Sequence, residues 1–196
     1  QLIDKRSIHN NHVQVINQYE VAPSEGGARY GNRYDVTILV NGLPMVHVEL
    51  KRRGVDLREA FNQIDRYQRQ SFWAGSGLFE YVQLFVISNG TLTKYYSNTT
   101  RQLKLNENKR ARRGRLASNS FEFTSWWADG RNRPIQDLPA FTRTFLSKRT
   151  LLNVLTRYCV LTADRMLLVM RPYQIAAADR ILNRIQIATN YRQLGT

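Results

Sequence analysis

Cysteine, histidine and acidic residues are all scarce in this chain. Its 196 residues include one Cys and three His, and 15 Asp and Glu stand against 29 Lys and Arg, which gives a formal net charge of +14. A single thiol cannot form a disulfide framework, so the sequence favours a reducing cytoplasm. No apolar run approaches the ~20 residues that a membrane span requires, and we expect no membrane contact.

The basic excess indicates a polyanionic partner. Arginine supplies 23 of the basic residues and lysine only six, and the planar guanidinium binds phosphate through two parallel contacts. Hydrophobic residues make up 42% of the chain, enough to form a core, which excludes global disorder. Nucleic acid is therefore the leading candidate partner. The excess is concentrated in residues 99–157, where 13 basic residues face four acidic ones.

Apolar periodicity and turn signals predict strands on both sides of one helix. Asn41-Gly42 and Asn89-Gly90 are strong hairpin signals, and Asp56 with Glu59 resembles a helix capping box. The expected strands cover residues 12–21, 34–40, 45–51, 81–87 and 91–96, and the expected helices cover 57–71, one or two segments after Pro139, and a last segment from Pro172. Residues 98–120 form a polar, basic stretch that we expect to be an exposed loop.

Two carboxylates and a lysine fall on the hairpin predicted over residues 34–51. Strand alternation places His47, Glu49 and Lys51 on one face, and Asp35 begins the partner strand. Neighbouring carboxylates repel each other unless a cation lies between them, and Mg²⁺ prefers such oxygen ligands. Lys51 could stabilise charge on a phosphate or hold the attacking water, whose pKa the metal would lower. The set therefore predicts Mg²⁺-dependent hydrolysis of phosphodiesters.

The register of this hairpin decides whether the two carboxylates meet. A three-residue loop that pairs Val40 with Pro44 places Asp35 opposite Glu49, with Cβ atoms about 5 Å apart. A strict two-residue Asn-Gly loop pairs Asp35 with Val48 and puts the carboxylates on opposite faces. A catalytic role thus requires the longer loop or a β-bulge.

Glu-x-Lys alone is a weak signal. Glu107-Asn108-Lys109 repeats it without a strand pattern or a nearby upstream Asp. On spacing alone, Glu49 and Lys51 could equally form a surface ion pair, with Asp35 as a turn residue.

Several motifs together resemble a known nuclease family. Asp35, thirteen residues and then Glu49-Leu50-Lys51 resemble the PD-(D/E)xK motif, with Tyr34 in place of the proline. Gln63-Ile64-Asp65-Arg66-Tyr67 matches the Gln-x-x-x-Tyr element of the branch related to the RecB nuclease. The nuclease domain of the restriction subunit of type I restriction-modification enzymes is similar in four further segments: Arg33-Tyr34-Asp35, Asn41-Gly42-Leu43-Pro44, Ala60-Phe61-Asn62-Gln63 and Arg171-Pro172-Tyr173-Gln174.

This resemblance implies an α/β fold with a central mixed sheet flanked by helices. Residues 1–140 would form the endonuclease domain, and 141–196 a helical linker and the start of a helicase-like motor. Asp35 and Glu49 would ligate Mg²⁺, Lys51 would be the catalytic lysine, and Gln63 and Tyr67 would support the site. The implied partners are double-stranded DNA and the methyltransferase and specificity subunits, in a bacterial cytoplasm.

The resemblance also suggests a role for Gln174 near the adenine of ATP in the full-length motor. The dipeptide Gly-Lys never occurs in the chain, so the phosphate-binding loop is missing and we expect no ATP hydrolysis by this segment alone. The expected explanation is truncation before that loop. Four arginines close to the motif, Arg52, Arg53, Arg66 and Arg69, are candidates for holding DNA phosphates without reading sequence.

Other residues are weaker candidates. We expect Cys159 to be a small buried thiol and His9 and His12 to be surface residues. Glu20 could be a further acidic neighbour of the site. The aromatic residues Phe121, Phe123, Trp126 and Trp127 could stack on unpaired bases, but core packing along a strand is favoured.

Two other functions stay open. The chain could be a non-catalytic DNA-binding or docking module whose acidic pair is structural. It could also be a stand-alone repair or junction-resolving nuclease.

Overall fold

A twisted sheet of five strands forms the centre of the computed structural model, which describes residues 2–21, 31–68, 72, 78–99 and 119–193. The strands lie in the order β1-β2-β3-β4-β5, and only β3 and β4 are parallel. Their bounds are Val13–Val21 for β1, Asn32–Val40 for β2, Leu43–Leu50 for β3, Leu84–Ser88 for β4 and Thr93–Ser97 for β5. A parallel pair needs a crossover connection, and helix α1 (Leu57–Tyr67) lies within it.

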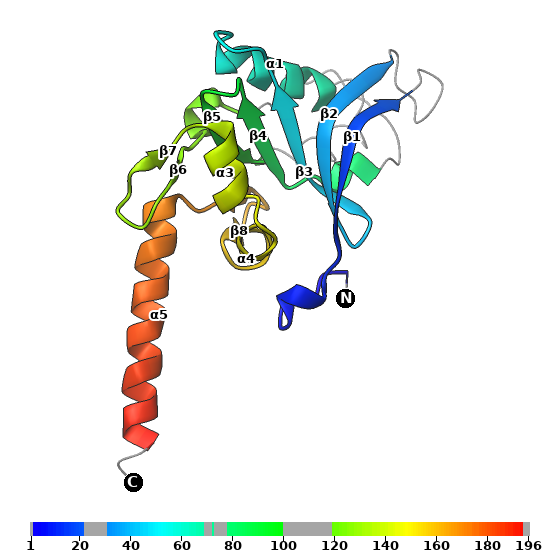
Figure 1. Cartoon of the computed structure of the whole chain (residues 1–196). Helices are drawn as coiled ribbons and strands as arrows, with labels where there is room; N and C mark the ends of the chain where they lie inside the picture. The colour runs from blue at the N-terminus through cyan, green and yellow to red at the C-terminus, as the bar shows by residue number, and fades with distance from the viewer. Residues whose placement is uncertain (1, 22–30, 69–71, 73–77, 100–118, 194–196) are drawn as a thin grey trace.

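Helices cover both faces of this sheet (Figure 1). Along β4, Leu84 and Val86 pack into one hydrophobic core with α3 (Leu138–Thr144) and α4 (Lys148–Arg157). Phe85 and Ile87 point the other way, into a second core beneath α1. A central strand covered on both faces reads as a continuous apolar run, and every residue of β4 is buried.

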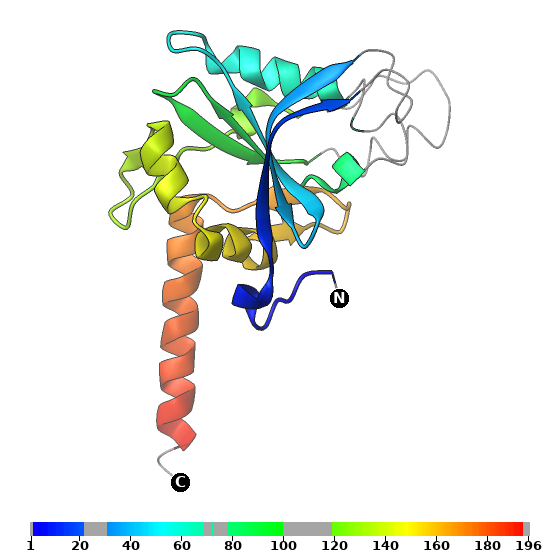
Figure 2. The same ribbon diagram turned by 45° about the vertical axis from the view of Figure 1, so that its right-hand side comes forward.

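The remaining elements are short, except for the last helix. Two small hairpins, β6 (Trp127–Ala128) with β7 (Pro134–Ile135) and β8 (Cys159–Leu161) with β9 (Leu167–Val169), lie beside the main sheet. The 3₁₀ turns are η1 (Ile8–Asn10), η3 (Leu78–Tyr81) and η4 (Phe121–Phe123). Helix α5 (Pro172–Gln193) projects away from the body in both views (Figures 1 and 2). None of the helices described here is long and apolar enough to span a membrane.

The structure confirms the expected α/β class with a mixed sheet, and it shifts several boundaries. The α-helical part of α1 ends at Tyr67, Gln68 keeps helical backbone angles, and the expected end near residue 71 lies outside the described residues. Residues 78–81 form the turn η3, so β4 starts three residues later than expected. The β8–β9 hairpin was not expected, because strands of three residues are too short to show periodicity. Most of the basic stretch over 98–120 lies outside the described residues.

The aromatic segment after residue 120 differs from the expected strand. Phe121 to Phe123 form the 3₁₀ turn η4, and Phe123 is 65% exposed, so its expected core packing is wrong. Phe121, Trp126 and Trp127 are partly buried against the two cores, which confirms core packing for them. Cys159 also packs against a core, and burial raises the pKa of its thiol to about 12.

Helix α3 spans the domain boundary expected at residue 140, and α4 lies beyond it. Phe141, Phe145, Leu151 and Leu152 are fully buried in the same core as the sheet residues. The first part of the expected linker is thus continuous with the sheet's core, and the division at 140 stays a prediction.

Candidate active site

A β-bulge brings the two candidate carboxylates together. The Asn41-Gly42 turn has two residues, because Val40 pairs with Leu43. The register then shifts by one residue, and Val36 pairs with Val48. Asp35 follows next along β2, where its Oδ2 accepts the backbone N–H of Leu50, the residue after Glu49. The β-bulge that a catalytic role requires is therefore present, and its one-residue shift compensates for the two-residue turn.

The Glu49 carboxylate is fully buried between the side chains of Lys51 and His47. Lys51 Nζ donates to its Oε1 at 2.9 Å, and His47 Nε2 lies 3.4 Å from its Oε2. Burying an ionised carboxylate is costly unless hydrogen bonds and an opposite charge compensate for the lost water. The side chain of Lys51 is 19% exposed, so this cation lies at the border between the buried carboxylate and solvent. The open alternative of a surface ion pair is thus wrong, because Glu49 is not on the surface.

Helix α1 supplies a chain of hydrogen bonds that holds Lys51. Lys51 Nζ donates to Gln63 Oε1, and Gln63 Nε2 donates to the Tyr67 hydroxyl. That hydroxyl donates to the Arg33 carbonyl at 3.0 Å. Gln63 and Tyr67 lie one helical turn apart, so they share one face of α1. Burial, chiefly, raises the pKa of Tyr67, and the nearby acidic groups raise it further, so the phenol stays a donor at neutral pH.

Asp35 keeps one carboxylate oxygen available. Its Oδ2 accepts the Leu50 backbone N–H at 2.8 Å, which fixes the side chain against β3. Its Oδ1 has no hydrogen-bond partner among the described residues. Within the described ranges, no three His, Cys, Asp or Glu side chains gather as a metal site. The donor set of two carboxylates fits Mg²⁺, which commonly takes one or two carboxylates and fills its shell with water and substrate phosphate.

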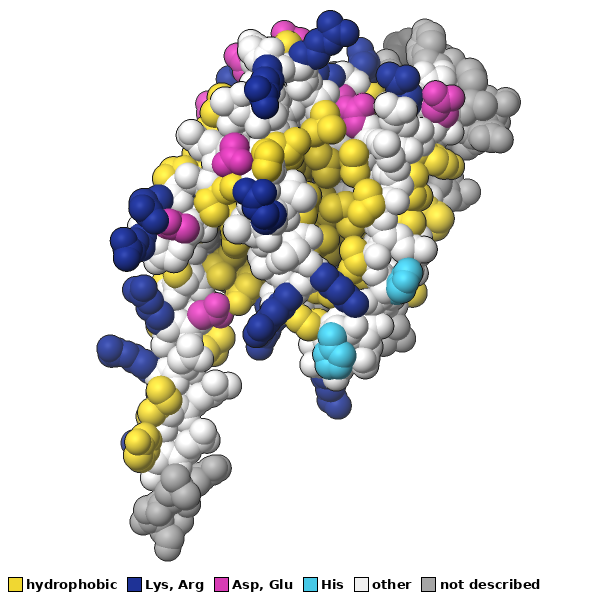
Figure 3. Space-filling view, viewed as in Figure 1, with side chains coloured by type: hydrophobic (Ala, Val, Ile, Leu, Met, Phe, Trp, Pro, Cys, Tyr) yellow, Lys and Arg dark blue, Asp and Glu magenta, His cyan; other side chains and the backbone are white. Residues whose placement is uncertain are grey.

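Three of the four candidate DNA-binding arginines lie within the described residues. Arg52, Arg53 and Arg66 are exposed, and the Arg66 guanidinium lies 5.8 Å from the Tyr67 ring centroid. Arg69 lies outside the described residues. On the face seen in Figure 3, Lys and Arg side chains are also dispersed over the edge formed by β6, β7 and α5.

The weaker candidates do not join the site. Glu20 is exposed on the edge strand β1, where it pairs with Arg33. His9 and His12 are exposed, as expected for surface residues. In the structure the Gln174 side chain caps α5, because its Oε1 accepts the Arg171 N–H at 2.8 Å. The role of Gln174 at adenine stays a prediction.

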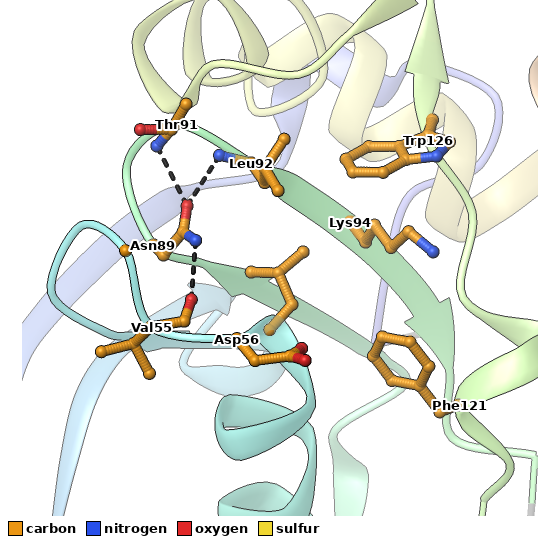
Figure 4. A pocket seen from close by; sticks show the side chains of 10 residues that line it. Val55, Asp56, Asn89, Thr91, Leu92, Lys94, Phe121 and Trp126 are labelled. Atoms are coloured by element: carbon orange, nitrogen blue, oxygen red, sulfur yellow. Dashed lines mark hydrogen bonds between the residues drawn. The ribbon is translucent and has the colours of Figure 1, made fainter.

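An open pocket of about 610 Å³ lies at the N-terminus of α1 (Figure 4). Asn89 closes one side, because its amide donates to the Val55 carbonyl at 2.8 Å and accepts from the backbone of Thr91 and Leu92. On the other side, Lys94 Nζ lies 5.0 Å from the Phe121 ring and 4.8 Å from the Trp126 ring.

Sequence reasoning assigned no role to Lys94 or His47. Burial lowers the pKa of Lys94, whose Nζ donates to Thr124 Oγ1 at 3.1 Å. Lys94 thereby attaches the segment after residue 119 to β5. The sequence signal for both residues was a lone basic or polar side chain inside an apolar strand.

Comparisons with known proteins agree with the motifs. The family model "Type I restriction enzyme R protein N terminus (HSDR_N)" matches residues 1–104. The chain is 52% identical over 193 residues to the type I restriction enzyme EcoprrI endonuclease subunit of Escherichia coli, covering 98% of this chain and 56% of that protein. It is 40% identical over 183 residues to the SauCOLORF180P endonuclease subunit of Staphylococcus aureus strain COL, covering 93% of this chain and 17% of that protein.

The chain therefore spans 56% and 17% of the length of these two relatives. The family match covers more than half of the residues of this chain and includes all five candidate site residues. By this match and by the motifs that the bulge and α1 bring together, the chain belongs to the type I restriction enzyme R protein family.

Proposed function

We propose that this chain is the Mg²⁺-dependent endonuclease part of a type I restriction-modification enzyme, and that it hydrolyses DNA phosphodiesters without sequence preference. One observation carries the proposal: beyond the bulge in the β2–β3 hairpin, Asp35 binds the backbone N–H of Leu50, next to Glu49, whose buried carboxylate holds Lys51. The relatives' name, endonuclease subunit, supports the same reaction.

Each site residue has a defined task in this reaction. Asp35 and Glu49 would hold Mg²⁺, which supplies Lewis-acid charge and lowers the pKa of bound water. Lys51 stabilises the negative charge that develops on the phosphate, because its ammonium is held in place before the reaction. Gln63 orients that ammonium, and Tyr67 orients Gln63. Protein groups fixed in advance need no reorganisation in the transition state.

The partners follow from the same proposal. Arg52, Arg53, Arg66 and Arg69 would bind backbone phosphates of double-stranded DNA, which positions DNA without reading its sequence. Methyltransferase and specificity subunits would select the target in the bacterial cytoplasm. An ATP-driven motor beginning near Arg171 to Gln174 would deliver the DNA, with Gln174 near adenine in the full-length protein.

Substituting the site residues tests the proposal. With the full-length protein and its partner subunits, Glu49→Ala or Lys51→Ala should lower the rate of Mg²⁺-dependent DNA nicking by at least ~100-fold, the cost of removing a charge-stabilising group in an active site. The matched control is Glu59→Ala, an exposed carboxylate on α1, which should leave the rate unchanged. ATP hydrolysis, measured in parallel, should persist in every variant.

If Glu49→Ala nicks DNA at the unchanged rate, the proposed catalytic role of this site is wrong. DNA binding without cleavage by the unchanged complex would favour the docking-module alternative. Cleavage without ATP or partner subunits would favour a stand-alone nuclease.

A further inference from the structure

The structure describes all three histidines, of which only His47 is buried, and His47 lies beside Glu49. Its side chain is fully buried in the middle of β3. Strand alternation places it on the same face as Glu49 and Lys51, and its Nε2 lies 3.4 Å from Glu49 Oε2. The second oxygen of the candidate metal ligand thus faces a ring nitrogen rather than solvent.

The surroundings of His47 decide which nitrogen carries the proton. Nδ1 is buried and has no hydrogen-bond partner in the part of the chain that the structure describes. A neutral imidazole has one N–H and one lone pair. A proton on Nδ1 would bury a donor without an acceptor and turn the Nε2 lone pair toward a carboxylate oxygen. Both effects are unfavourable, so the proton belongs on Nε2, which then donates to Glu49.

Aromatic rings fix the orientation of the imidazole. The rings of Tyr34, Tyr67 and Phe72 lie at centroid distances of 5.6, 6.0 and 5.4 Å, each nearly perpendicular to it. Such edge-to-face contacts stabilise one ring position. Tyr67 also belongs to the hydrogen-bond chain that runs from Lys51 through Gln63. Tyr67 thus contacts His47, which lies at Glu49 Oε2, and is connected through Gln63 to Lys51, which binds Glu49 Oε1.

We propose that His47 is a positioning residue that donates from Nε2 to Glu49 Oε2 and so fixes the Glu49 carboxylate for the divalent cation. This inference rests on the proposed function, because it deepens the role of the same metal site. Lys51 holds Oε1 and His47 holds Oε2. Without His47 the carboxylate can rotate toward Lys51 and away from Asp35. Groups that orient metal ligands typically contribute 10- to 100-fold to metal affinity.

The test measures Mn²⁺ binding to the full-length protein without nucleotide or DNA, by electron paramagnetic resonance of the free ion. His47→Gln keeps an N–H donor at a similar reach, and we expect its Mn²⁺ affinity to stay within about threefold of the unchanged protein. His47→Met fills the volume without a donor, and His47→Asn keeps an amide that is too short. We expect both to lose at least about 10-fold, the range for residues that orient metal ligands.

Two controls separate this inference from the proposed function. Thr37 is a buried residue of β2 that pairs with His47 on β3. Thr37→Val leaves the His47 donor in place, so Mn²⁺ affinity should not change. Glu49→Ala should abolish binding at this site; if it does not, the metal site itself is wrong. If Glu49→Ala abolishes binding while a folded His47→Met or His47→Asn binds Mn²⁺ as tightly as the unchanged protein, only the role of His47 is wrong.

Folding of each variant is checked by thermal unfolding, and His47→Asn is the deciding variant if His47→Met does not fold. A loss in His47→Gln as large as that in His47→Met or His47→Asn would also overturn the inference, because a purely structural role does not distinguish a donor at the right reach from one that is too short.

Discussion

Tyr67 is the residue that connects the candidate site to the backbone of the sheet. Its hydroxyl accepts from Gln63 and donates to the Arg33 carbonyl, two residues before Asp35. Lys51 depends on this connection, because Gln63 holds the ammonium through its other amide atom. The position of the reactive cation is therefore set by a residue that need not touch the substrate.

At this scale we predict the effect of Tyr67→Phe. The ring stays, but two hydrogen bonds are lost, so the unfolding free energy should fall by about 1 kcal/mol for each bond. DNA nicking should slow by about 10-fold, since even a small misplacement of a catalytic group slows the reaction. Urea unfolding and single-turnover nicking check the two parts. Tyr19→Phe, an exposed tyrosine on β1, is the control and should change neither; nicking at the unchanged rate in Tyr67→Phe would contradict the orienting role.

Helix α1 is the element on which the site depends most. Its N-cap is Asp56, whose side chain accepts the Arg58 N–H at 2.8 Å, at the second helical residue rather than at Glu59. The Asn89 side chain holds the preceding loop through the Val55 carbonyl. Gly90, in the β4–β5 turn, has a φ of +85° that favours glycine. The Asp56 cap and the Asn89 contact thus both fix the start of the helix that carries Gln63.

The Asp56 cap leads to a prediction about the stability of helix α1. Asp56→Ala removes an acceptor from the first turn and should lower the unfolding free energy by about 1 kcal/mol. Asp56→Ser restores an acceptor and should recover most of that loss. Chemical unfolding followed by circular dichroism measures both. Equal stability of the two variants would show that the cap does not stabilise α1.

Tyr95 and Tyr96 show how the whole molecule is held together. They are neighbours on β5 and point to opposite faces, Tyr95 into the core under α3 and Tyr96 into the core under α1. The Tyr95 hydroxyl also donates to the Met170 carbonyl at 3.0 Å, just before α5. Burial raises the pKa of both phenols above the ordinary value of 10.0. Each of the two hydrophobic cores therefore contains a tyrosine whose phenol is buried in its neutral form.

This arrangement predicts loss of stability in alkali. Above pH 10 the unfolded chain releases the two phenolic protons while the folded chain keeps them. The unfolding free energy therefore falls as pH rises, by up to ~1.4 kcal/mol per pH unit for each tyrosine. Lys94, whose pKa burial lowers, acts in the opposite direction but is a single, partly buried group.

Urea unfolding between pH 8 and 11.5 measures this dependence. Tyr95→Phe and Tyr96→Phe should each reduce the slope above pH 10, whereas the exposed Tyr19 serves as a control whose Phe variant should keep the slope. A profile that stays flat up to pH 11.5 would contradict the prediction.

Much of the fold could be predicted locally. Apolar runs, alternation and turn signals together predicted all five strands of the main sheet, and Asn41-Gly42 and Asn89-Gly90 correctly marked two turns. The spacing of Gln63 and Tyr67 placed them on one helical face. The β8–β9 hairpin could not be found this way, since its pairing depends on contacts between strands of three residues.

By itself, the sequence determined which residues could do chemistry: Asp35, Glu49 and Lys51 on one hairpin, with a basic excess that favours DNA. Only the tertiary structure decided how they meet. The Asn-Gly turn favours a register that separates the carboxylates, and a bulge between Ile38 and Leu39 shifts that register by one residue. Burial of Glu49 between Lys51 and His47 was likewise undetermined by sequence, because burial depends on α1 covering this face of the sheet.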